Sequence, residues 1–171
     1  MNQDDLRRLL DGGDRRSIGQ VNEAVSRIRG SPSNVSVAVQ VMGDTDPLIS
    51  MRAADALEKA SRSDPDLLLP HKHALLKDLA KNPQQEVRWH LLQMLPRLPL
   101  TPEERTEAFA IAVHSLDHRS RIVVADALSA MFSLSVDDAA LRRRAEYHAD
   151  RLTSSPSAAV KSRAKRLLSG G

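Results

Sequence analysis

The sequence predicts an all-α fold, a right-handed α–α superhelix (solenoid) of four to five helix pairs. A short polar turn leading into a helix recurs four times, and the four helices carry apolar residues at the same offsets. The blocks span residues 46–57, 84–95, 117–128 and 157–168. Their equivalent first positions, 49, 87, 120 and 160, lie 38, 33 and 40 residues apart. Periods of this length indicate stacked helix pairs, because one pair alone is too small to bury its apolar face.

The predicted core follows from the register of these blocks. Apolar side chains recur at the fourth, seventh and eighth residues after each first position, and the fourth and eighth share a helical face. A solenoid hides that face between its layers. The residues expected to be buried are Ala53, Leu57, Leu91, Leu95, Val124, Leu128, Ala164 and Leu168.

Length and composition limit the class of protein. A chain of 171 residues suits a single repeat domain, 1–171. Aromatic residues make up 2% of it, so the apolar content comes from Ala, Leu and Val, which suits closely packed helices. The absence of Cys excludes disulfides and thiolate metal sites. No apolar run approaches the ~20 residues of a membrane span, and residues 1–10 show no signal peptide, so we expect a soluble, cytoplasmic protein.

Helix signals divide the chain into a cap and four helix pairs. Residues 1–34 are expected to form a divergent N-terminal cap or repeat, with helices near 4–10 and 17–29. The helix pairs are expected at 35–62, 66–97, 101–134 and 137–168.

The first helices of the last three pairs each have a start signal. Thr101 precedes Pro102 and two glutamates, which predicts an N-cap followed by a first turn favoured by the helix dipole. A helix is also expected after Asp64, bent at Pro70 because proline lacks the amide hydrogen of a regular helix. Ser135 begins the signal for the last pair.

The stretch from Val35 to Val41 fits two secondary structures. Its strict alternation of β-branched residues is typical of a half-buried strand. At helical spacing, however, Val35, Ala38 and Val39 also share a face. We predict a helix, because the repeat register requires one and a lone strand has no second strand to pair with.

The repeated blocks resemble a known family. Asp-Pro precedes Ile49 by two residues, Arg follows Val87 directly, and the blocks continue as Ala-x-x-Ala/Met-Leu or a close variant of it. This pattern resembles the HEAT repeat over roughly residues 35–168 and implies a fold of HEAT-like helix pairs. Proteins of that family mostly act as scaffolds that grip peptides or domains on a concave surface, so the resemblance implies protein binding without catalysis.

The helix face opposite the core is the predicted partner site. It should carry the second, third and sixth residues after each first position, which places Arg52 and Val123 on it as well. The candidate partner-binding residues on this concave face are Asp55, Trp89, His90, Gln93 and Asp126. Trp89, the only Trp, fits two interpretations: an exposed binding hot spot or a side chain packed between repeats.

Basic residues gather toward the C-terminus. From position 119 onward the chain has ten basic and five acidic side chains. The candidate basic patch consists of Arg142, Arg143, Arg144, Arg163 and Arg166. Such a patch is either the solvated surface of a terminal repeat or an electrostatic footprint for nucleic acid.

Two functions are consistent with these features. The first is a non-enzymatic scaffold that binds a protein partner of unknown identity. The second is a nucleic-acid-binding protein similar in kind to the alkylpurine DNA glycosylases of HEAT-like architecture, with Trp89, Asp126 and the C-terminal arginines in the family roles. No cofactor is expected, and His114 and His118, four residues apart, lack a third ligand for a metal. We favour the scaffold.

Overall fold

The computed structural model describes residues 1–12 and 20–170, and throughout these ranges the secondary structure is helical, with no β-strand. The all-α prediction is confirmed. The predicted helix near 17–29 lies partly outside the described residues, and its visible part begins at Val21. The chain forms two compact units, Met1–Pro99 and Leu100–Gly171.

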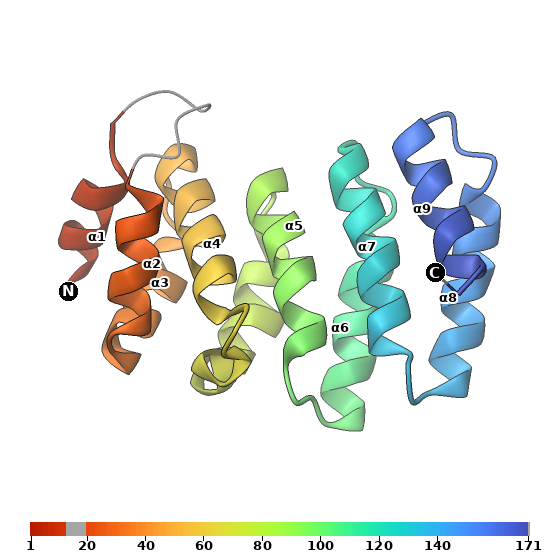
Figure 1. Ribbon diagram of the computed structural model, residues 1–171, viewed down its shortest axis with the longest axis horizontal. Coiled ribbons are helices and arrows are strands. Elements are labelled where there is room, and N and C mark those ends of the chain that lie inside the picture. Colours follow the sequence, from red (N-terminus) through yellow and green to blue (C-terminus); the bar gives the residue numbers. More distant parts are fainter. Residues whose placement is uncertain (13–19, 171) are drawn as a thin grey trace. The chain divides into compact units, whose positions relative to one another are not determined.

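The first unit contains a layer of second helices packed on a layer of first helices (Figure 1). Its elements are α1 (Gln3–Leu10), α2 (Val21–Arg29), α3 (Pro32–Val41), α4 (Pro47–Ser61), η1 (Pro65–His71), η2 (Ala74–Asp78), η3 (Leu79–Lys81), α5 (Gln85–Met94) and η4 (Leu95–Arg97). Helix α4 packs against both α2 and α5, whereas α3 packs against α1 and η1. The side of the unit formed by α2, α4 and α5 is called here the second-helix face.

The ambiguous valine-rich stretch is helical, as the repeat register predicted. It forms most of α3, which starts at Pro32, a favoured first helical residue. Val35, Ala38 and Val39 are buried together, so the helical periodicity rather than the alternation decides the structure.

The first helix of the next pair is irregular. Between Pro65 and Lys81 the backbone passes from 3-10 turns through a π turn and back to a 3-10 turn. Pro70 lies inside the first of these segments, where it cannot donate a backbone hydrogen bond. The segment is helical, as expected, but it consists of 3-10 and π turns in place of one regular α-helix.

Polar side chains fix where α4 begins and how it sits in its unit. The carboxylate of Asp46 accepts the amide hydrogens of Leu48 and Ile49, at 2.8 and 3.4 Å. The Ser50 hydroxyl donates to the Met42 carbonyl at 2.6 Å and ties α4 to the preceding helix. These bonds satisfy backbone groups that a helix end would otherwise leave without partners.

The second unit consists of two regular helix pairs, α6 (Pro102–Ser115) with α7 (Arg121–Leu134) and α8 (Ala139–Leu152) with α9 (Ala158–Leu168). The second helices of these pairs, α7 and α9, pack against each other. The predicted N-cap is confirmed: Thr101 Oγ1 accepts from Glu104 N at 3.2 Å, while Glu104 Oε2 accepts from Thr101 N at 2.9 Å. This reciprocal pair is a capping box.

Seven of the eight predicted core residues are buried. The prediction for Leu168 was wrong, because its side chain is 38% exposed. Leu168 is the last residue of α9, and no element of the described chain follows to cover that turn. Within the described residues no helix is both long and apolar enough to cross a membrane.

The exposure predicted for two residues of the outward face was also wrong. Arg52 and Val123, expected on the outward face, are 2% and 0% exposed. The guanidinium of Arg52 donates to the backbone carbonyls of Leu10 and Gly12, at the end of α1. The third position of the block therefore turns inward in these two helices instead of facing solvent.

Candidate functional site

The candidate residues of the first unit come from α4 and α5, which pack side by side. Asp55 is half-buried and forms an ion pair with Lys59, one helical turn later. The Lys59 Nζ lies 2.7 Å from Oδ2 of Asp55. The second carboxylate oxygen of Asp55 lies 3.9 Å from Nε2 of His90 on the adjacent helix. The structure thus brings Asp55 and His90 together and binds Lys59 to the same carboxylate.

Burial controls the charge of His90. Removal of the ring from water lowers the pKa of His90, although the carboxylates of Asp55 and Glu58 and a hydrogen bond with Gln93 act in the opposite direction. A pKa below the usual value near 6.5 leaves the ring neutral at neutral pH. His90 therefore carries no positive charge at neutral pH, and its side chain is only 12% exposed.

Trp89 is half-buried, between the two interpretations that the sequence left open. Its indole meets the ring of His90 edge-on, with centroids 5.5 Å apart and planes at 62°. This T-shaped contact is a favourable aromatic arrangement and restrains both rings. Gln93, one turn further along α5, is exposed.

The second unit repeats the same connection with different residues. Asp126 on α7 is half-buried, and Oδ1 of its carboxylate lies 3.9 Å from Nη1 of Arg163 on α9. The same Nη1 donates to the Ser129 hydroxyl. Asp126 and Arg163 occupy the block positions of Asp55 and His90, so the aspartate at the sixth position faces the third position of the next second helix in both units.

The arginines of the predicted basic patch have separate surroundings. Arg142 pairs with Glu146 at 2.9 Å and lies 4.5 Å over the Phe132 ring. Arg144 lies 4.9 Å over the ring of Phe109. Two of the three consecutive arginines on α8 therefore pack on aromatic rings of their own unit, where cation–π attraction stabilises them.

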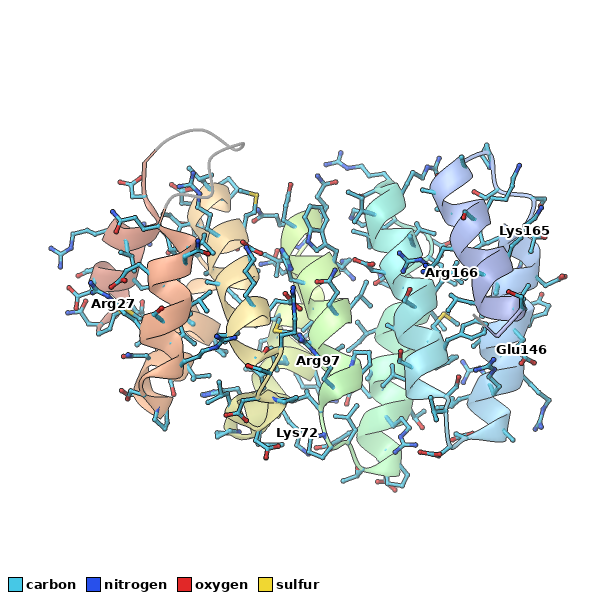
Figure 2. All side chains as sticks on the ribbon, in the orientation of Figure 1. Arg27, Lys72, Arg97, Glu146, Lys165 and Arg166 are labelled. Carbon is cyan, nitrogen blue, oxygen red and sulfur yellow. The ribbon has the colours of Figure 1, made fainter. Side chains whose placement is uncertain are left out.

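The remaining arginines of the patch differ in their exposure to solvent. Arg143 and Arg166 are exposed, while Arg163 is half-buried against α7. Figure 2 shows Arg166 extending from α9 on the side of α7. The exposed members of the patch are thus Arg143 and Arg144 on α8 and Arg166 on α9, of which Arg144 also lies over the Phe109 ring.

Sequence reasoning missed an ion-pair cluster on the second-helix face. The carboxylate of Glu58, only 5% exposed, pairs with Arg62 at 2.6 Å and with Arg97 at 3.2 Å. The hydrogen bond from Arg62 to this carboxylate raises the pKa of the guanidinium. The i,i+4 spacing of Glu58 and Arg62 could have indicated their pairing. Nothing local indicates Arg97, which belongs to the next helix pair.

The histidine pair considered as metal ligands has another arrangement. His114 is exposed, whereas His118 Nδ1 accepts the amide hydrogen of Ser120 at 3.0 Å, just before α7. Over residues 1–12 and 20–170 there is no group of three or more side chains with the composition of a metal site.

Comparison with known proteins now identifies the fold. The model of the HEAT repeat domain matches residues 13–133. The structure is similar to the crystal structure of an archaeal HEAT-like repeats protein from Thermococcus onnurineus NA1, with a TM-score of 0.64 and 20% sequence identity. That similarity covers 96% of this chain and 63% of the archaeal chain. No curated protein sequence matches the chain. Because the family model spans most of the sequence, the chain belongs to the HEAT repeat domain family.

Proposed function

We propose that this protein is a non-enzymatic interaction module that binds a protein partner through the second helices of its pairs. The contact residues are Asp55, Trp89, His90 and Gln93 in the first unit, with Asp126 on α7 in the second. HEAT-like repeats generally serve protein–protein interaction, which supports the class of function. The exposed arginines of α8 and α9 would increase the rate of association with an acidic partner.

The half-buried Trp89 is the observation that carries this proposal. A partner that covers the exposed part of the indole gains apolar burial without ordering a flexible side chain, because His90 already restrains the ring. His90, which contacts the indole, itself lies 3.9 Å from the carboxylate of Asp55 and hydrogen-bonds with the exposed Gln93, so polar groups lie close to this aromatic side chain. An aromatic anchor within a polar rim is typical of protein interfaces.

The test begins with affinity capture by the full chain from a lysate of its native cell, with and without nuclease. The dissociation constant of the captured partner is then measured for Trp89→Ala and Asp126→Ala variants shown to stay folded. Loss of a hot-spot Trp should weaken binding by about 30-fold or more. Tyr147→Ala is the matched control, because Tyr147 is a 60% exposed aromatic side chain on a first helix, α8.

Three results bear on the proposal. Weaker binding by the Trp89 variant and unchanged binding by the Tyr147 variant support it. Undiminished binding by both the Trp89 and Asp126 variants rejects the second-helix site. Capture of nucleic acid alone, abolished by nuclease and by arginine-to-glutamate changes at 142–144, replaces the scaffold with the nucleic-acid function.

A further inference from the structure

A groove with a cationic rim lies between α2 and α4 in the first unit. Its volume is about 410 Å³, within the size range of small-ligand pockets. The groove is lined by Asn22, Val25, Arg29, Lys59, Arg62 and Ser63, and it is called here the basic groove. Val25 and the aliphatic stems of the three cationic side chains give it apolar surface.

Hydrogen bonds hold the rim cations in place. The guanidinium of Arg29 donates to the carbonyls of Lys59 and Ala60, at 2.8 and 3.1 Å, across from α2 to α4. It also donates to the Ser63 hydroxyl at 3.3 Å. Because these bonds fix the guanidinium before any ligand arrives, little side-chain entropy remains to be lost on binding.

Positive charge exceeds negative charge around the groove. Lys59 pairs with Asp55, and Glu58 is shared between Arg62 and Arg97. Figure 2 shows Arg97 beside α4 and α5. With Arg29, four cations face two carboxylates, so the cluster keeps a surplus of positive charge that a ligand can neutralise.

We propose that the basic groove binds an acidic peptide segment, with Glu or Asp side chains on the rim cations and one apolar side chain against Val25. The inference rests on the proposed protein-binding function and names the chemistry of its partner. Arg62, whose side chain is 65% exposed, can add a carboxylate ligand in the bidentate geometry that guanidinium favours. The groove lining holds no aromatic ring on which a base could stack, and the adjacent carboxylates repel a continuous phosphate backbone, so the groove suits a peptide better than nucleic acid.

The experiment uses the full chain and fluorescein-labelled peptides in an anisotropy titration. The probe has the core Glu-Glu-Leu-Glu-Glu, and two controls replace either its glutamates by Gln or its Leu by Ser. The double variant Lys59→Gln/Arg62→Gln should lower the affinity for the probe by about tenfold, because it removes two charge contacts at the surface. The matched control is Arg27→Gln/Lys77→Gln, since Arg27 also pairs with a glutamate one turn away, Glu23, and neither residue lines the groove.

A second variant keeps the test valid if the double variant unfolds. Asn22→Glu places a carboxylate in the groove without removing any of its ion pairs, and it should weaken the acidic probe by repulsion. The proposal is overturned if the Gln peptide binds as well as the Glu peptide, or if both groove variants bind the probe like the unmodified chain. It is also overturned if only a single-stranded oligonucleotide binds the groove.

Failure here remains distinct from failure of the proposed function. If the acidic probe does not bind while Trp89→Ala abolishes binding of the captured protein partner, only the groove inference is rejected. If the probe binds and the Trp89 and Asp126 variants still bind the captured partner, the groove inference is supported and the proposed second-helix contact residues are rejected.

Discussion

Arg163 Nη1 lies 3.9 Å from Asp126 Oδ1, and this pair joins α7 to α9. In the first unit the same two block positions hold Asp55 and His90, also 3.9 Å apart. The aspartate is common to both pairs, whereas its partner is a permanent cation in one unit and a largely neutral ring in the other. The two pairs therefore share the block positions of a contact between adjacent second helices, while the charge of the contact differs.

Burial of the repeat core predicts a large loss of stability on truncation. Leu95 and Leu128 are both 0% exposed, so replacing either with Ala should lower the free energy of unfolding by about 2–5 kcal/mol. Leu168→Ala is the internal control, because its 38% exposed side chain loses little burial and should change stability by about 0.5 kcal/mol. Urea unfolding followed by circular dichroism measures all three. Losses under about 1 kcal/mol at both buried sites would show that the repeat register is wrong.

Removal of the charge on Glu58 should destabilise the first unit. Glu58→Gln leaves the guanidiniums of Arg62 and Arg97 near a neutral amide, and a lost charge-assisted hydrogen bond costs about 1–3 kcal/mol. Glu23→Gln provides the comparison, since its pair with Arg27 is solvent-exposed and contributes about 0.2–1 kcal/mol. Equal effects of the two substitutions in urea unfolding would contradict a structural role for the buried carboxylate.

The sequence predicts helix starts well and contacts between repeats poorly. The signals at Asp46 and Thr101 are local, and the structure uses each as an N-cap. The prediction that Arg52 faces outward was wrong, because its hydrogen-bond partners are carbonyls at the end of α1, some forty residues earlier in the chain. The link from Glu58 to Arg97 was missed for the same reason: periodicity gives the face of a helix but not its neighbour.

Stability should fall as the pH is lowered from neutral. Burial lowers the pKa of His90 in the folded chain, while in the unfolded chain the pKa returns to about 6.5. Below that value the unfolded state binds a proton that the folded state does not, so the free energy of unfolding decreases until the folded-state pKa is reached. Burial also lowers the pKa of His71 and His148, which should add to the fall.

The measurement is urea unfolding at about pH 7.5 and 5.5, on either side of the unperturbed histidine pKa. His90→Gln should show a smaller loss of stability between the two pH values than the unmodified chain. His73→Gln is the control, because the His73 side chain is exposed, and it should retain the full loss. A fall of the same size in the His90 variant would mean that other groups cause the pH dependence.

Salt dependence separates the two functions that the sequence left open. A protein partner held by Trp89, with a few carboxylates on the basic groove, should lose much less affinity than a nucleic-acid complex as salt rises, because apolar burial is not screened and only those few charge contacts are. A nucleic-acid complex with six phosphate contacts should instead lose about 10³ in affinity between about 50 and 200 mM salt, because binding releases counterions. Titrations of the captured partner at several salt concentrations give this slope directly. A steep slope that becomes shallower in an Arg143→Gln/Arg166→Gln variant would assign the binding to phosphates at the exposed arginines, whereas a shallow slope that this variant leaves unchanged supports the protein interface.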